Sequence, residues 1–520
     1  MSAGNVSSVK IVGVIGVGTM GRGIAQLAAQ AGLHVRLFDK DAAALKNAMD
    51  GIMSAWGKDV VKGRMDTTAM QRAHTRLTAV DRLAALADCD VVVEAIVEDL
   101  QIKQQLFVDL EDIVSESTLL ATNTSSLSVT AVQSACRLPG RVVGWHFFNP
   151  VPRMKLAEVV QGALTDAVAV DTLMALTLTL GHKSVRAKDM PGFVVNHAGR
   201  AFIPEGLRIL SEEIADAHTI DRIMKSVAGF RMGPFELADL IGLDVAQTVM
   251  ESLYHQYYEE ARFRLHPILG QRVAAGLLGQ KSGKGFYVYE DKATLPPPSG
   301  IIASETSGAA ACPTRDVDIA AMPVWISPEH ADLARSVAEQ LAPLSVLLEH
   351  GGRPSSDALI LTTPIGADAT STCLALDLDP ARSVAVNALF GLDNHVELMR
   401  TPATRPDAMA AARALFERSG LEVSCINDSP GFVSQRIVAQ IVSIGCDIAQ
   451  QGIGSPEDIN LAARIALGYP AGPLDMGDGL GAERILTICD AMYEAYRDPR
   501  YRASVWLRRR AGLGLSLNHE

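Results

Sequence analysis

The sequence of 520 residues predicts an α/β domain with a doubly wound, largely parallel sheet, then an all-α domain, with a degenerate copy of both in the second half. Three observations carry this prediction. A strand–turn–helix–strand unit opens the chain, apolar strand-like runs then alternate with helical stretches, and short motifs recur at a constant offset. A chain of this length exceeds a single hydrophobic core, so we expect several domains.

The first domain is predicted from the order of its apolar runs. Residues 10–40 contain an apolar strand, a Gly-rich turn, an Ala-rich helix and a second apolar strand, which is a βαβ unit. Further strand-like runs occupy residues 91–97, 118–123 and 141–148, with helical stretches between them. Such alternation favours a mostly parallel sheet covered by helices.

The pattern changes after Pro191, where long periodic segments without strand signals predict a helical domain that runs to residue 290. Residues 291–316 include a triple proline and are rich in Gly, Ser and Ala, as expected for a linker that buries little. The predicted segments are 1–187 (dinucleotide-binding, Rossmann-type), 188–290 (helical), 291–318 (linker), 319–426 (degenerate Rossmann-like) and 427–520 (second helical).

The second half repeats the first. DMPGFVV at 189–195 matches DSPGFVS at 428–434, and MGPFELAD at 232–239 matches AGPLDMGD at 471–478. Both pairs are separated by an offset of 239 residues, with no gap between them. The chain therefore contains a tandem duplication whose second copy has diverged.

Composition excludes several classes of partner. The balance of 47 Lys and Arg against 59 Asp and Glu gives a net charge of −12, so the chain has no global positive field for nucleic acid or an anionic membrane. Its 7 cysteines are scattered and never spaced CxxC, which argues against a disulfide framework and a zinc site, and we expect no metal. Without a targeting segment or a run of about 20 apolar residues, a cytoplasmic location is expected.

The opening turn has the pattern of a dinucleotide site. Gly16, Gly18 and Gly21 form GxGxxG between a strand and a helix, where a pyrophosphate can approach the backbone and the helix N-terminus. Asp39 ends the next strand, and a carboxylate there accepts from ribose hydroxyls and repels a 2′-phosphate. The alternatives are an ordinary Gly-rich turn and a solvated strand-end acid. We predict NAD as the cofactor.

Two further residues suggest acid–base chemistry. His146 lies at a strand end between aromatic residues, and Glu158 follows twelve positions later inside an apolar run. A buried acid is costly unless it is paired, so the two are predicted to form a dyad in which the acid orients the imidazole. A packed core histidine is the alternative interpretation.

Seven motifs resemble the short-chain (S)-3-hydroxyacyl-CoA dehydrogenases, in order, over about the first 290 residues. They are GxGxMGxGIA (16–25), VEAIVEDLQIKQQLF (93–107), ATNTSSL (121–127), HFFNPVPRMKLAEVV (146–160), KDMPGFVVN (188–196), FRMGPFELADLIGLD (230–244) and GQKSGKGFY (279–287). The combination is far more specific than any single motif.

The resemblance implies roles for individual residues. His146 would be the general base and Glu158 its orienting partner, while Ser125 and Asn196 would contact the reacting part of the substrate. The expected cofactor contacts are Gly16, Gly18, Thr19, Met20, Gly21, Asp39, Glu98, Lys103, Asn123, Asn149 and Lys281. The alternatives are loop caps for Ser125 and Asn196 and solvated charges for Lys103 and Lys281.

The coenzyme A end departs from the family pattern, which places a Ser and a Lys on the helices after the second strand. Here the corresponding positions are Ala55, which cannot donate a hydrogen bond, and Lys62. Lys62 is the predicted phosphate contact, and Lys58 is an equally reasonable candidate.

The resemblance implies NAD-dependent oxidation of an (S)-3-hydroxyacyl-CoA. The tandem extension is similar to the bacterial long form associated with phenylacetate catabolism, which implies 3-hydroxyadipyl-CoA or 3-hydroxybutyryl-CoA as substrate. Arg153 or Arg200 could pair with a terminal carboxylate. The alternatives are a silent NAD-binding relative and a 6-phosphogluconate or 3-hydroxyisobutyrate type of dehydrogenase, which relies on a catalytic Lys.

The second copy is predicted to be inactive. Alignment places Asn387 where His146 stands, Glu397 where Glu158 stands and Gln435 at the position of Asn196, and no GxGxxG precedes this copy. An amide cannot act as a base near neutral pH. We expect residues 427–520 to pack against the first helical domain as an intramolecular pseudo-dimer, with a homodimer as the alternative.

Overall fold

The computed structural model describes residues 9–290, 293–295 and 322–520. Residues 291–292 and 296–318 of the predicted linker lie outside this part. The described chain forms two compact units. The first consists of Met1–His197 and Gln451–Leu467, and the second of Ala198–Gln450 and Gly468–Glu520. A short stretch of the second copy thus belongs to the first unit.

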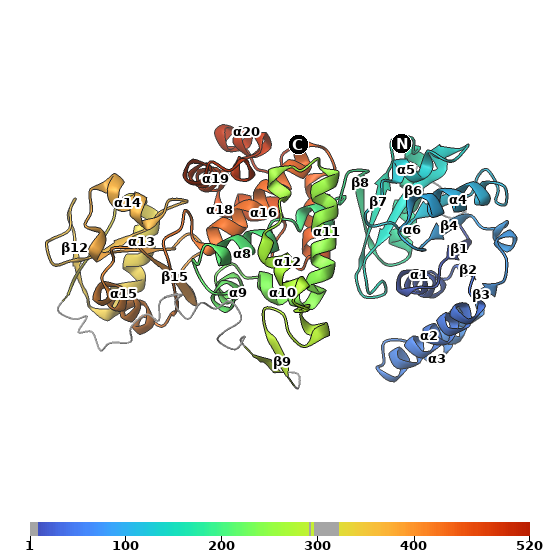
Figure 1. The fold of residues 1–520 in the computed structure, drawn as a ribbon, viewed down its shortest axis with the longest axis horizontal. Coiled ribbons are helices and arrows are strands. Elements are labelled where there is room, and N and C mark those ends of the chain that lie inside the picture. The colour runs from blue at the N-terminus through green and yellow to red at the C-terminus, as the bar shows by residue number, and fades with distance from the viewer. Residues whose placement is uncertain (1–8, 291–292, 296–321) are drawn as a thin grey trace. The chain divides into compact units, whose positions relative to one another are not determined.

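The first unit is built on an eight-stranded sheet in the order β3-β2-β1-β4-β5-β6-β7-β8 (Figure 1). Its neighbours pair in parallel except β6 and β7, which are antiparallel. The strands are β1 (Ile11–Ile15), β2 (His34–Phe38), β3 (Leu77–Val80), β4 (Val91–Glu94), β5 (Leu119–Thr122), β6 (Val142–Phe147), β7 (Leu156–Gln161) and β8 (Lys183–Lys188). The order reverses between β1 and β4, where ligands bind in open α/β sheets.

Both faces of this sheet are covered. Val91 and Val93 pack into the core under α1, α2 and α6, whereas Val92 packs into the core under α4 and α5. Burial on both faces explains why the sequence of β4 begins with an unbroken apolar run. The helices of this unit are α1 (Thr19–Gln30), α2 (Ala42–Val61), α3 (Thr67–Thr75), α4 (Leu100–Glu111), α5 (Val129–Gln133), α6 (Ala167–Thr179), the start of α7 (Val195–Ala198), and α17 (Pro456–Ala466).

The second unit contains a six-stranded sheet in the order β12-β11-β13-β14-β15-β16. Its single antiparallel pair, β14 with β15, has the same place in the order as β6 with β7. The strands are β11 (Pro323–Ile326), β12 (Leu347–Glu349), β13 (Leu359–Thr362), β14 (Ser383–Val386), β15 (His395–Arg400) and β16 (Glu422–Ile426), with helices α13 (Ala331–Leu341), α14 (Ala369–Leu376) and α15 (Pro406–Arg418). This sheet is the degenerate copy of the first.

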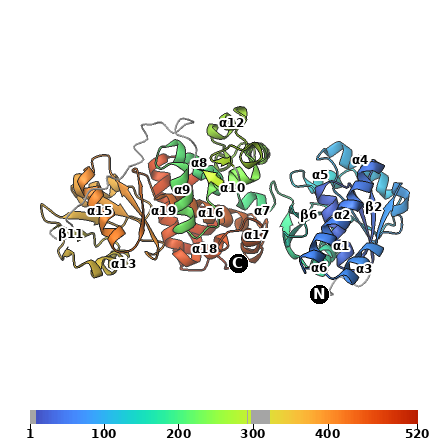
Figure 2. The same cartoon turned by 90° about the horizontal axis from the view of Figure 1, so that it is seen from below.

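The helical copies pack together within the second unit. Helix α16 (Val433–Gln450) is buried along almost its whole length and contacts α8, α9, α18, α19 and α20. Figure 2 shows α16 among α8, α9, α18 and α19. The remaining elements are α8 (Phe202–Ser211), α9 (Ala217–Ser226), α10 (Pro234–Ile241), α11 (Leu243–Gln256), α12 (Pro267–Ala274), α18 (Pro473–Leu480), α19 (Ala482–Tyr496), α20 (Val505–Leu513) and the hairpin β9 (Val288–Glu290) and β10 (Ala293–Leu295). Among the described helices, none combines the length and apolar character of a membrane span.

Candidate active site

The sheet register brings His146 and Glu158 together. They are direct cross-strand partners in the antiparallel pair of β6 and β7, and the imidazole Nδ1 lies 2.8 Å from the carboxylate Oε2. His146 is 5% exposed and Glu158 is fully buried. A carboxylate at this distance accepts the Nδ1 proton, so the neutral ring carries its lone pair on Nε2. This is the geometry of an oriented general base.

Backbone donors hold the carboxylate from its other side. The amides of Val194 and Val195 each donate to Oε1 of Glu158 at 2.9 Å. Both residues follow β8, and Val195 begins the short helix that contains Asn196. The ring of His146 is confined by Phe148 and Phe193, with centroids 4.5 and 5.7 Å away.

The three glycines of the turn after β1 differ in what a side chain at each position would meet. Gly16 has φ +93°, and a Cβ there would lie 2.5 Å from the carbonyl oxygen of Ala95. A Cβ on Gly21 would lie 1.9 Å from the carbonyl oxygen of Gly16, whereas one on Gly18 would meet nothing within 4 Å. The first and third glycines therefore close the turn, and the second leaves open space before the N-terminus of α1. These features fit a pyrophosphate cradle.

Asp39 lies directly after β2 and is tied to this turn. Its Oδ2 accepts from the amide of Val17 at 2.9 Å, and its Oδ1 accepts from the amide of Asp41 at 3.0 Å. Asp39, Gly16 and Gly18 line one cavity of about 910 Å³. The cavity and the carboxylate of Asp39, which can accept from ribose hydroxyls, fit the ribose end of NAD. By contrast, Met20 packs against the hydrophobic core of the unit.

A network of hydrogen bonds and an ion pair around Glu98 supports the NTSS segment. Oε1 of Glu98 accepts from the hydroxyl of Thr124 at 2.5 Å and from the amides of Ser125 and Ser126 at 3.1 Å each. Lys103 lies 3.2 Å from Glu98. Burial works to raise the pKa of Glu98, but the hydrogen bond from Thr124 and the charge of Lys103 bring it below its usual value. Glu98 therefore anchors the exposed Ser125 through its backbone.

Lys103 has a second partner, which sequence reasoning missed. Its side chain is 1% exposed and forms a buried ion pair with Glu94, whose other oxygen accepts from Thr122 at 2.8 Å. Since the ammonium lies between two carboxylates, its predicted contact with the cofactor stays a prediction. The side chain of Asn123 accepts from the amide of Phe147 at 2.9 Å and so joins the ends of β5 and β6 beside His146.

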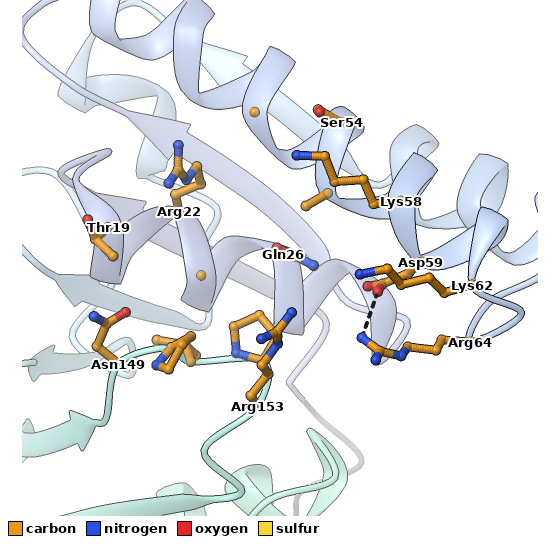
Figure 3. A pocket seen from close by; sticks show the side chains of 16 residues that line it. Thr19, Arg22, Gln26, Ser54, Lys58, Asp59, Lys62, Arg64, Asn149 and Arg153 are labelled. Atoms are coloured by element: carbon orange, nitrogen blue, oxygen red, sulfur yellow. Dashed lines mark ion pairs between the residues drawn. The ribbon is translucent and has the colours of Figure 1, made fainter. Parts of the chain in front are cut away.

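A basic cavity of about 590 Å³ lies among α1, α2 and the loop after β6 (Figure 3). The predicted residues Thr19, Asn149 and Lys62 line it, together with Lys58 and Ala55. Further lining residues, which were not predicted for a coenzyme A site, are Arg22, Ser54, Arg64 and Arg153. The spacing of four between Ser54, Lys58 and Lys62 places them on one helix face and is the signal that could have identified Ser54. Asp59 is paired with Arg64 at 3.6 Å, so the cavity is strongly positive.

Lys281 is placed in the second unit, where it forms an ion pair with Asp244. Its predicted role over the cofactor stays a prediction.

The degenerate copy keeps the register but not the base. Asn387 lies opposite Glu397, as its amide donates to the Glu397 carbonyl at 3.0 Å, and its side chain donates to the carboxylate at 2.8 Å. Gln435 donates to the Asn387 side-chain oxygen at 3.0 Å and accepts from the amide of Gly366 at 2.9 Å. Burial raises the pKa of Glu397 to about 7, although hydrogen bonds from Ser434 and Asn387 oppose this. Side chains of the copy itself thus occupy the place of the base.

Comparison with known proteins identifies the family of both halves of the chain. The family model for the NAD binding domain of 3-hydroxyacyl-CoA dehydrogenase matches residues 11–190, and the model for its C-terminal domain matches two stretches, 192–289 and 431–516. These stretches begin 239 residues apart, as the repeat predicts.

The relatives include long and short chains. The 3-hydroxyadipyl-CoA dehydrogenase of Escherichia coli K12 is 36% identical over 507 residues, which cover 97% of this chain and 98% of that one. The 3-hydroxybutyryl-CoA dehydrogenase of Clostridioides difficile is 39% identical over 276 residues, 53% of this chain and 98% of that one. A crystal structure of 3-hydroxybutyryl-CoA dehydrogenase from Escherichia coli K12 has a TM-score of 0.83 and 35% identity, and covers 97% of this chain and 99% of that one. The chain belongs to the 3-hydroxyacyl-CoA dehydrogenase family and is an NAD-dependent oxidoreductase.

Proposed function

We propose that the enzyme oxidises the C3 hydroxyl of an (S)-3-hydroxyacyl-CoA and that His146 is the general base. The observation that carries this proposal is the hydrogen bond of 2.8 Å between the imidazole Nδ1 and the buried Glu158. This bond selects the tautomer whose Nε2 can accept a proton, and the carboxylate stabilises the imidazolium that results. Two backbone amides keep that carboxylate oriented.

Other predicted residues would bind the cofactor and orient the substrate. NAD supplies the hydride acceptor. The glycine turn would hold its pyrophosphate, and Asp39 would hold its ribose. The open space at Gly18 and the fixed position of the Asp39 carboxylate support this assignment. Ser125, held in place by Glu98 through its backbone, would position the hydroxyl or the thioester, and Asn196 would support the reacting oxygen.

The basic cavity is the proposed site of the coenzyme A phosphates. Lys58, Lys62 and Arg22 line it and offer several donors to a polyanion, whereas the chain as a whole is acidic. Ser54 would supply the hydroxyl that Ala55 lacks.

For the acyl part we propose 3-hydroxyadipyl-CoA. The long relative that matches 97% of the chain carries that substrate in its name. The second candidate is 3-hydroxybutyryl-CoA, because the long crystal structure is that of a 3-hydroxybutyryl-CoA dehydrogenase. The proposed partner of a terminal carboxylate is Arg153, which lines the basic cavity, or Arg200.

Steady-state kinetics with NADH on 3-oxoadipyl-CoA and acetoacetyl-CoA test both proposals. We expect turnover of both, with the higher kcat/KM for 3-oxoadipyl-CoA. The reverse preference would overturn the dicarboxylic assignment alone. Absence of turnover with both thioesters would favour the catalytically silent alternative. Membership of the family argues against the 6-phosphogluconate or 3-hydroxyisobutyrate type.

We also propose a pseudo-dimer of helical copies within one chain. Arg436 from the second copy is fully buried and pairs at 2.7 Å with Glu205 from the first copy, and Tyr501 donates to the same carboxylate at 2.9 Å. A buried pair of this kind specifies one arrangement, because either charge alone would be costly.

We further propose a cytoplasmic location. It is supported by six cysteines of the described chain, which are thiols and not disulfides.

A further inference from the structure

We propose that residues 451–467, which come from the second copy of the repeat, position the His146–Glu158 pair of the first copy. This inference rests on the proposed function, because it concerns the residues that hold the proposed base in place. It gives the second copy, which is predicted to be inactive, an indirect part in catalysis.

The segment adds to the edge of the first sheet. Its helix α17 packs against β7 and β8. The amide of Lys188, the last residue of β8, donates to the carbonyl of Ile453 at 2.8 Å, and its ammonium lies 3.4 Å from the carbonyl of Gln451. The edge strand therefore ends against chain from the second copy.

Close packing leads from this segment to the dyad. Gly454 is buried against Val194, and a Cβ on Gly454 would lie 2.9 Å from Cγ2 of Val194. Val194 is itself fully buried, and its amide donates to Oε1 of Glu158 at 2.9 Å. Since Oε2 of Glu158 holds His146, a displacement of Val194 is transmitted to the base through a single carboxylate.

The backbone around Val194 needs outside support. It lies between the end of β8 and α7, so no strand pairing fixes its amide. The preceding Phe193 has φ +46°, a left-handed conformation that residues with side chains adopt only when their surroundings impose it. Asp189 holds the start of this loop through the amides of Val129 and Thr130. Gly454 provides the packing at its end.

The repeat offers a matched comparison. The first copy presents its equivalent segment to the degenerate sheet, where the amide of Asn427 donates to the carbonyl of Ile214 at 2.9 Å. At the offset of 239, Ala215 takes the place of Gly454, and it is 3% exposed. The two copies thus exchange equivalent segments, but only the first sheet carries His146.

The test compares Gly454→Val with Ala215→Leu, because each adds three carbons at an equivalent buried position. In oxidation of (S)-3-hydroxybutyryl-CoA we expect kcat of Gly454→Val to fall about 10- to 100-fold, since small misplacements of a catalytic group have effects of this size. The dissociation constant of NADH, measured by fluorescence titration, should stay unchanged. Ala215→Leu should keep the kcat of the wild type, although both variants lower Tm.

A double-mutant cycle shows whether Gly454 acts through Glu158. If it does, Gly454→Val lowers kcat little further in the Glu158→Gln background, and both single variants move the acid limb of the kcat profile to lower pH. The proposal would be overturned by additive losses of kcat in the double variant, by an unshifted pH profile of kcat, or by equal losses of kcat in Gly454→Val and Ala215→Leu.

A readout without turnover separates this inference from the proposed function. A hydrogen bond from Nδ1 to a carboxylate gives a downfield imidazole proton signal, assigned by its loss in His146→Ala. We expect Gly454→Val, but not Ala215→Leu, to weaken or shift it. If the wild type lacked dehydrogenase activity, this signal would still decide whether residues 451–467 position the pair, and an unchanged signal in Gly454→Val would refute it.

Discussion

At the scale of single residues, we expect His146 and Glu158 to control turnover. His146→Ala should lower kcat by about 10²- to 10⁴-fold, the usual contribution of a general base. NADH binding should be retained, because the cofactor cradle is formed by other residues. Measurement of kcat with acetoacetyl-CoA and of the NADH dissociation constant checks this, and a variant with the kcat of the wild type would disprove the assignment.

Glu158→Gln should cost less than His146→Ala, because the amide still accepts a hydrogen bond from Nδ1. It cannot offset the charge of the imidazolium, so the acid limb of the oxidation profile should move to lower pH. The pH dependence of kcat distinguishes this effect from a loss of stability.

Asp39 should set the preference for NAD over NADP. Its carboxylate is held by the amides of Val17 and Asp41, so it would face a 2′-phosphate with little freedom to move away. In Asp39→Ser, the kcat/KM with NADH divided by that with NADPH should fall roughly tenfold or more. The reason is that like charges placed against each other cost several kcal/mol, and serine removes the charge that opposes the 2′-phosphate. Equal efficiency of the wild type with both cofactors would contradict this.

At the scale of elements, one face of α2 should recognise the phosphates of coenzyme A. Lys58 and Lys62 line the basic cavity, whereas Lys46 of the same helix is exposed and lies outside its lining. Lys58→Ala and Lys62→Ala should each raise KM for acetoacetyl-CoA about tenfold, the worth of a hydrogen bond to a charged group.

Two controls accompany this prediction. Lys46→Ala should leave KM unchanged, and a truncated thioester without the nucleotide should respond to none of the three changes. If the KM for the truncated thioester rose as much as the KM for acetoacetyl-CoA, the cavity would have a role other than binding the phosphates.

Glu397, buried on β15, should make the free energy of unfolding depend on pH. Burial raises the pKa of Glu397 to about 7 from 4.5, so the folded state binds the proton more tightly than the unfolded state. The resulting stability is present below pH 4.5 and is lost as pH rises through about 7. Glu397→Gln should therefore lose less stability than the wild type between pH 5 and 8.

The expected difference is on the order of 1–3 kcal/mol, measured by urea unfolding at both pH values. Glu339→Gln, at an exposed position of α13, is the control and should follow the wild type. Parallel curves for the wild type and Glu397→Gln would show that the carboxyl is ionised in the folded protein throughout this range.

At the scale of the whole molecule, the two halves should not be separable. Truncation after Glu290 removes α16, which packs on α8, and α17, which packs on β7 and β8. We expect the shortened chain to lose solubility or, where it folds, to lose kcat or change its acyl-chain preference. A stable monomer with unchanged kinetics would show instead that the second copy is an independent tethered domain.

The cofactor turn was predictable because its causes are local. Gly16, Gly18 and Gly21 lie within six residues, and their steric roles follow from a strand that turns directly into a helix. The pair of His146 and Glu158 was predicted from the cost of a buried acid. The stretch around Glu158 reads in the sequence only as an apolar run, so the antiparallel β7 that places the acid opposite the histidine was not predicted.

The sequence by itself determined the fold class, the duplication, the cofactor turn and the loss of a base in the second copy, since each rests on residue types at short or constant spacing. The tertiary structure decided which groups satisfy the buried charges and what packs behind them. Glu94 pairs with Lys103, the amides of Val194 and Val195 donate to Glu158, and Gly454 packs against Val194. The contact of Gly454 with Val194 joins segments hundreds of residues apart. No local pattern encodes such contacts, because a buried charge is satisfied by whichever partner the folded chain brings within reach.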